Sequence, residues 1–265
     1  MLVGHTVTKP QSQRWLYRLS YVLLLMIFLL PPYAEKPYLP QEQGQVIHAL
    51  LRVTPAEPYH VLAPLFHLAT LALIGLIVWR PAQAGRVLAA YMGINYLVIG
   101  WVQGQGVTTT YGYVVHTGNV IACLILAILW LRAAMHNRLH LSLQHRDWRL
   151  YALAPLALLA FWSPAAITSS GVYPDFNPAL LFTSLPYGLT YCLTTPVFLF
   201  WLIIAVPHVP PFTYRVTAFN ALLYGLINLA LWFDPAVWWV GFLHLPLLVL
   251  AIVALLLARQ RLPIS

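Results

Sequence analysis

Residues Pro178 to Pro207 read PALLFTSLPYGLTYCLTTPVFLFWLIIAVP, and this stretch decides the fold. It is long and apolar enough to span a bilayer, which takes about 20 residues in a helix. Two prolines, Pro186 and Pro196, interrupt it, and each removes a backbone donor and frees a carbonyl. Hydrocarbon offers no partner for such groups, so neighbouring helices, hydroxyls or water must supply one. The sequence therefore predicts an interrupted spanning helix surrounded by other helices.

The hydroxyl groups of this stretch gather on one face. Thr183, Tyr187, Thr190, Tyr191 and Thr194 follow one another at the spacing of one side of a helix. Lipid is a poor environment for such a face. We therefore expect these side chains to point into the interior of a helix bundle.

The composition of the whole chain indicates an all-α polytopic membrane protein. Hydrophobic residues make up 61% and charged residues only 8%, whereas soluble domains carry roughly a quarter of charged residues. The mean hydropathy is +0.76. A net charge of +8 suggests a nucleic-acid partner, but the cations stand in short segments between apolar runs, so none is expected. No polar linker divides the chain, and residues 1–265 are expected to form one transmembrane domain.

Apolar runs of the required length predict about eight transmembrane helices. They cover residues 15–33, 59–79, 87–102, 111–131, 150–167, 181–206, 216–233 and 237–258. The first run also fits a signal peptide, whose cleavage after Ala34 would leave seven spans that begin outside the cell.

Basic residues orient these spans. With eight spans, 12 of the 14 lysines and arginines fall on one side, and only Lys36 and Arg52 fall on the other. Cytoplasmic loops carry the excess of lysine and arginine, so both termini are expected in the cytoplasm of a cell whose plasma (inner) membrane holds the chain. Residues 1–14 then form a cytoplasmic tail, residues 33–58 an external connector, and residues 132–149 a basic cytoplasmic loop.

The external loops carry two further signals. Within the connector, GQVIHALLRV (Gly44 to Val53) has the pattern of a short amphipathic helix on the membrane surface, with an ordinary loop helix as the alternative. Asp175 and Asp234 lie next to prolines in two other external loops. Turn formation and helix capping are the roles expected of them, ahead of cation binding.

The polar residues within the predicted spans carry hydroxyl, thiol or amide groups or are histidines. Ion pumps and many proton-coupled carriers depend on buried charges, so the absence of deep Asp, Glu, Lys and Arg argues against a carboxylate-driven pump. On four spans such residues align on one face: His60 with His67; Tyr91 with Asn95; His116 with Asn119 and Cys123; and Thr217 with Asn220, Tyr224 and Asn228. A fifth span carries His244 alone.

If these faces turn inward, they line a polar pocket in the outer half of the bilayer. The residues expected to line it are His67, His116, Tyr187, Tyr191, Asn228 and His244. Because no buried charge is present, the pocket would bind or pass a small neutral or weakly basic solute. No catalytic residue and no metal ligand is assigned.

Three alternatives remain open. The aligned faces are equally typical of helix-to-helix contacts, as in a non-catalytic subunit or assembly factor of a larger membrane complex. His67 and His244, at similar depth on different helices, could ligate a b-type haem, and His48, His60 and His116 a metal ion. A membrane enzyme acting on a lipid or quinone would use Cys192, Asp175 or a deep histidine.

Overall fold

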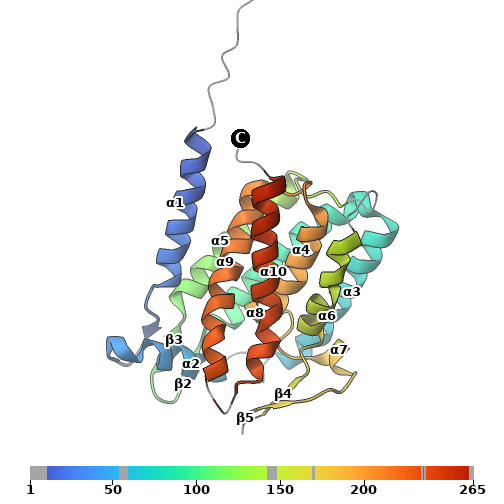
Figure 1. Cartoon of the computed structure of the whole chain (residues 1–265). Coiled ribbons are helices and arrows are strands. Elements are labelled where there is room, and N and C mark those ends of the chain that lie inside the picture. Colours follow the sequence, from blue (N-terminus) through green and yellow to red (C-terminus); the bar gives the residue numbers. More distant parts are fainter. Residues whose placement is uncertain are drawn as a thin grey trace, which may run out of the picture.

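The computed structural model describes residues 11–53, 59–141, 148–168, 171–233, 235 and 237–262. Most of the predicted tail of residues 1–14 lies outside the described residues, and so does Asp234. The described chain is mostly helical (Figure 1), as the all-α prediction requires.

Seven apolar helices form the bundle. They are α3 (Ala63–Trp79), α4 (Pro81–Val102), α5 (Thr117–Met135), α6 (Ala154–Trp162), α8 (Tyr191–Ala205), α9 (Pro211–Ile227) and α10 (Val240–Arg261). Two 3₁₀ segments extend them: η3 (Trp148–Leu153) leads into α6, and η4 (Asn228–Phe233) follows α9. Within the described residues, four helices are long and apolar enough to cross a membrane: α4, α5, α9 with η4, and α10. The others are apolar but shorter, so the count of eight spans stays a prediction.

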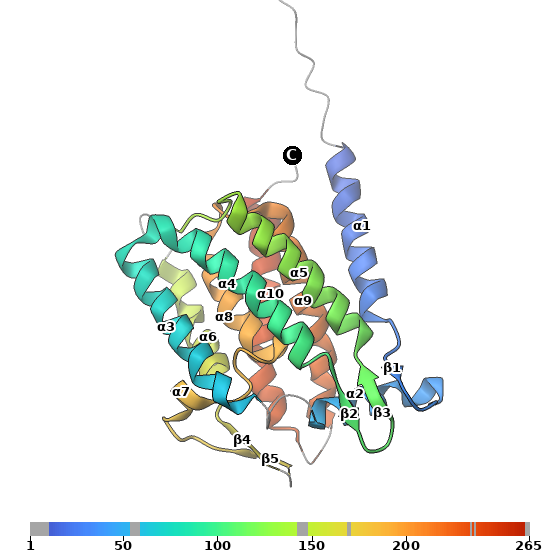
Figure 2. The same cartoon turned by 180° about the vertical axis from the view of Figure 1, so that it is seen from behind.

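The remaining helices lie at the edges of the bundle. α1 (Gln11–Phe28) stands to one side and packs against α5 and α9 (Figures 1 and 2). Its inner face places Tyr21 against Phe219, with ring centroids 4.5 Å apart, and Phe28 against Tyr224 at 5.2 Å. Its outer face leaves Met26 exposed, as a lipid-facing helix would.

Both ends of the described chain lie at one end of the bundle, which we call the basic end (Figures 1 and 2). The arginines at the helix termini there are Arg80, Arg132, Arg138, Arg259 and Arg261. The strands lie at the opposite end, which corresponds to the predicted outer side.

Arg215 directly precedes the predicted span of residues 216–233, which places it in a loop, but the structure does not. It belongs to α9 and is buried, and its Nη2 atom donates hydrogen bonds to the carbonyls of Ala258 (2.6 Å) and Leu262 (2.5 Å). Carbonyls at the end of a helix lack intrahelical partners, and a cation there is favoured. Arg215 therefore caps the end of α10.

Short antiparallel strands close the end opposite the basic end. β1 (Tyr33–Ala34), β3 (Gly112–Val115) and β2 (Gln105–Thr108) form one sheet in the order β1–β3–β2, and β4 (Ala165–Thr168) pairs with β5 (Gly171–Pro174). In the first sheet Gln105 pairs with Val115 and Thr108 with Gly112. The predicted span of residues 111–131 is therefore wrong at its start, because these residues satisfy their backbone groups by pairing with β2 and the helix begins only at Thr117.

The predicted helix in the external connector is present. α2 (Gln43–Val53) follows the 3₁₀ turn η1 (Pro40–Glu42) and buries Val46 and Leu50 against Val114 of β3. A second 3₁₀ turn, η2 (His60–Leu62), leads into α3.

Candidate functional site

The interrupted helix consists of two pieces joined by a turn. α7 (Leu180–Thr183) ends before Ser184, and α8 begins at Tyr191. The turn contains Pro186, whereas Pro196 lies inside α8 without ending it. The prediction of a broken helix is thus confirmed, but the prediction that residues 183 to 194 form one continuous helical face is wrong, because residues 184–190 are not helical.

Gly188 makes this turn possible. Its φ is +81°, and a Cβ atom there would lie 2.2 Å from Cγ of Phe66, so any side chain would clash with α3. Its backbone groups are satisfied by side chains: the N–H donates to the Thr194 hydroxyl at 2.8 Å, and the carbonyl accepts from Asn95 Nδ2 at 2.9 Å. Buried backbone at membrane depth needs such partners.

Gln103 completes the turn. Its Oε1 accepts a hydrogen bond of 2.9 Å from the backbone N–H of Tyr191, the first residue of α8. Gln103 follows α4 directly, and Asn95 lies within α4, so one helix supplies both amides that hold the turn. The sequence placed Asn95 on a polar face, but Gln103 was missed as a partner, because its bond to Tyr191 joins residues 88 positions apart.

His67 and Tyr187 lie together on one side of the turn. Both are fully buried, with ring centroids 4.9 Å apart. The Nδ1 atom of His67 donates to the Ala63 carbonyl at 2.8 Å, and Nε2 lies 3.1 Å from the Ser184 hydroxyl. The Tyr187 hydroxyl shares a hydrogen bond of 2.8 Å with Thr70. These groups satisfy one another, as interhelical contacts do.

Tyr191 belongs to a second cluster, at the start of α8. Its hydroxyl accepts a hydrogen bond of 2.9 Å from Asn220 on α9, and its ring lies 4.7 Å from that of Tyr224. The Tyr224 hydroxyl in turn donates to Asn119 Oδ1 on α5 at 3.0 Å. Tyr191, Asn220 and Asn119 are almost completely buried. This cluster joins three helices.

Asn228 and His244 form a third group, between α9 and α10 at the end of the bundle opposite the basic end. They face a narrow crevice together with Gly225, Trp232 and Gly241. The crevice is too narrow for a whole water molecule. The ring of Trp232, which lines it, packs against Phe242 with centroids 4.3 Å apart.

Each of these two residues uses one polar atom within the protein. Asn228 Nδ2 donates to Cys192 Sγ at 3.1 Å, and His244 Nδ1 donates to the Val240 carbonyl at 2.9 Å. The other polar atoms, Asn228 Oδ1 and His244 Nε2, have no partner among the described residues. Because Nδ1 carries the proton of the neutral imidazole, Nε2 is an acceptor. The crevice therefore presents two hydrogen-bond acceptors.

Among the described residues, His116 shares no side-chain hydrogen bond or ring contact with the three groups. It precedes α5, outside the apolar helix, and its backbone N–H donates to the Gly104 carbonyl at 2.8 Å. Burial lowers the pKa of His116 to about 4, so the imidazole is neutral at physiological pH. The six residues predicted to line one pocket thus occupy four separate places: His67 with Tyr187, Tyr191, Asn228 with His244, and His116.

The cofactor alternatives fit this geometry poorly. Both ring nitrogens of His67 lie within hydrogen-bond distance of protein atoms, which leaves neither free for haem iron opposite His244. Within the described part of the chain, no three His, Cys, Asp or Glu side chains lie close enough to hold a metal ion, and the side chain of His60 lies outside that part. Asp175 accepts a hydrogen bond from the backbone N–H of Asn177, which is the turn role expected of it.

Comparisons with protein-family models, with curated proteins and with solved structures return no match. The function must therefore be argued from the residues themselves.

Proposed function

We propose that this chain is a multi-pass protein of the plasma membrane that binds or passes a small neutral or weakly basic solute at its outer end. Both termini and the basic end face the cytoplasm in this proposal, and eight spans cross the bilayer. The solute enters the crevice between the outer ends of α9 and α10.

One observation carries the proposal: the two unpartnered acceptors, Asn228 Oδ1 and His244 Nε2, belong to residues that line the same crevice. Buried or partly buried acceptors without partners are costly, and they favour a ligand that brings donors. A neutral solute with N–H or O–H groups fits, and so does a weakly basic amine. An anion does not fit.

The crevice is narrower than a water molecule, so it must widen for the solute to enter. The segment that would move is η4, because a 3₁₀ extension has weaker hydrogen bonds than the α-helix before it. Gly241 permits close contact with Trp232, since a Cβ atom there would lie 2.4 Å from the indole Nε1. We propose that Trp232 swings outward with η4 when the solute binds.

The proposed solute site uses only two of the six residues predicted to line the pocket, Asn228 and His244. His67, Tyr187 and Tyr191 hold the broken helix in place from its two sides and do not contact the solute in this proposal. They position α8, whose Cys192 anchors the Asn228 amide.

Solute flux into liposomes tests the proposal. The purified chain is reconstituted, and swelling is followed with urea, glycerol and methylamine as probes. The proposal predicts flux of at least one probe above that of protein-free liposomes. The variant Asn228→Leu with His244→Leu should lower it about tenfold, because two hydrogen bonds of about 0.7 kcal/mol each are lost. Flux at the protein-free level, or equal flux through the double variant, would contradict the proposal.

A different observation favours a second candidate function. Every residue of the predicted α9 stripe bonds to another helix: Thr217 to Trp130, Asn220 to Tyr191, Tyr224 to Asn119, and Asn228 to Cys192. Contacts of this kind favour a non-catalytic subunit or assembly factor of a membrane complex. Co-purification of defined partners after gentle solubilisation, with no solute flux in liposomes, would support this second function.

A further inference from the structure

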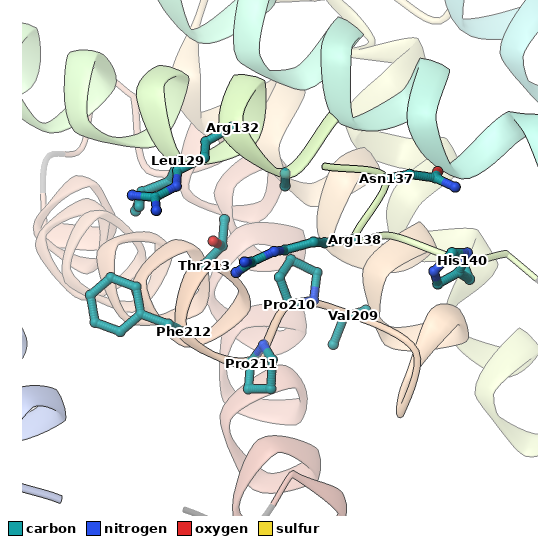
Figure 3. A pocket seen from close by; sticks show the side chains of 11 residues that line it. Leu129, Arg132, Asn137, Arg138, His140, Val209, Pro210, Pro211, Phe212 and Thr213 are labelled. Atoms are coloured by element: carbon teal, nitrogen blue, oxygen red, sulfur yellow. The ribbon is translucent and has the colours of Figure 1, made fainter. Parts of the chain in front are cut away.

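A wide pocket lies at the basic end, far from the crevice. It has a volume of about 580 Å³ and is formed by the end of α5, the chain that follows α5, and the segment that leads into α9 (Figure 3). The residues that line it include the buried Ala133 and Thr213. Pockets of this size are typical of small-molecule sites.

Among the residues that the structure describes, every ionisable side chain that lines the pocket is basic. Arg132 comes from the last turn of α5, and Arg138 and His140 come from the chain after it. Figure 3 shows Arg138 extending from its loop toward Thr213 and Arg132 extending down from α5 on the side of Phe212. Neither guanidinium has an ion pair or hydrogen bond with the described residues. Arg215, by contrast, donates hydrogen bonds from its guanidinium to carbonyls at the end of α10.

Backbone hydrogen bonds fix the chain that carries these side chains. α5 ends in a Schellman motif: Asn137 has φ +47°, its N–H donates to the Ala134 carbonyl, and the Arg138 N–H donates to the Ala133 carbonyl. The N–H of His140 then donates to the His208 carbonyl at 3.0 Å, which ties this chain to the segment before α9. The backbone that carries the cationic side chains thus belongs to a structured turn.

The start of α9 belongs to the same pocket. α9 begins at Pro211, and its first intrahelical hydrogen bond is donated by Tyr214 to Pro210. Phe212 and Thr213, whose backbone N–H groups precede that bond, are among the residues that line the pocket. N–H groups at a helix start favour anions, and they add to the charge of Arg132 and Arg138.

We propose that this pocket binds the phosphate group of an anionic ligand, with Arg132 and Arg138 as the residues that hold it. The planar guanidinium matches phosphate oxygens in pairs, and basic pockets between helices at the cytoplasmic surface suit lipid head groups. Leu129 and Phe212 give one side of the pocket an apolar wall. An acyl chain could lie along that wall, which favours a phospholipid over free phosphate.

Binding measurements on the full-length purified chain test this. The probes are dioctanoyl phosphatidic acid, dioctanoyl phosphatidylcholine and inorganic phosphate. The test variant is Arg132→Gln with Arg138→Gln. The control variant is Arg86→Gln with Arg259→Gln, which removes the same charge from exposed sites at the same end and outside the pocket. Equal melting temperatures establish that both variants fold.

The proposal predicts saturable binding of phosphatidic acid, weakened about tenfold or more in the test variant and less than about twofold in the control. Phosphatidylcholine should bind at least about tenfold more weakly than phosphatidic acid, since its head group has no net charge. If inorganic phosphate competes for the site as strongly as phosphatidic acid, the site is a phosphate site whose ligand is soluble. Equal losses in the two variants, or no binding of either phosphate probe, would overturn the proposal.

Discussion

Asn220 on α9 donates a hydrogen bond of 2.9 Å to the hydroxyl of Tyr191, which is the first residue of α8. Both side chains are almost completely buried. The bond joins the helix that follows the broken segment to its neighbour in the bundle. The polar residues around the break therefore act first as links between helices.

A double-mutant cycle measures this link. Asn220→Leu and Tyr191→Phe each leave one buried polar group without its partner, whereas the double variant removes both. We expect each single change to lower the free energy of unfolding and the double change to cost less than their sum. The coupling should be about 0.6 to 2 kcal/mol, measured by denaturant unfolding in detergent. Strictly additive losses would show that the bond contributes nothing.

Gly188→Ala should disrupt the break itself. The residue has a positive φ, and its new Cβ atom would overlap the Phe66 ring. We expect a loss of more than about 2 kcal/mol of unfolding free energy or failure to fold. Gly44→Ala is the matched control, because Gly44 lies in α2 with open space around it, and this change should gain up to about 1 kcal/mol. Equal stability of the two variants would argue against the turn described here.

Arg215→Met removes the cap of α10. The carbonyls of Ala258 and Leu262 lose a charged donor, so the unfolding free energy should fall by about 2 to 3 kcal/mol. Hydrogen exchange should increase in the last turn of α10 more than elsewhere. Arg86→Met, which removes an exposed charge at the same end, should change stability by less than about 0.5 kcal/mol. A similar, small effect of both changes would contradict the capping role.

His116 should make the fold sensitive to acid. Its pKa in the folded protein is about 4, below the ordinary value of 6.5, so the unfolded chain takes up the proton first as the pH falls. The contribution of His116 is complete above pH 6.5 and is lost as the pH falls toward about 4. His116→Asn should therefore flatten the dependence of the melting temperature on pH within this window. An unchanged slope would show that the side chain is not protected from protonation.

Much of the helical architecture could be predicted from the sequence, because apolar runs and prolines act locally. Pro186 correctly marked a break, since the residues around it could not continue a helix. Pro196 was a weaker signal, because α8 continues through it. The strand at residues 112–115 was missed, since its pairing with residues 105–108 depends on the turn at Gly112, whose φ is +67°.

The candidate sites were harder to predict, for a physical reason. Helical spacing identified the faces that carry Asn220 and Tyr224, but it could not show that other helices would satisfy them. Only contacts between distant residues separate a sealed link from an open lining. Arg132 and Arg138 were interpreted as topology signals, and the pocket beside them arises from the start of α9, more than 70 residues further along the chain.

Cysteine labelling in intact cells tests the central claim most directly. In a variant with Cys123→Ala and Cys192→Ala, His244→Cys is compared with Ser184→Cys by exposure to a membrane-impermeant thiol reagent. Ser184 is fully buried beside His67, and His244 lines the outer crevice. Because the crevice opens from outside, the account predicts slow labelling of position 244 from outside and labelling of position 184 only after denaturation. Equal labelling of both positions, or labelling of position 244 only after the cells are permeabilised, would contradict it.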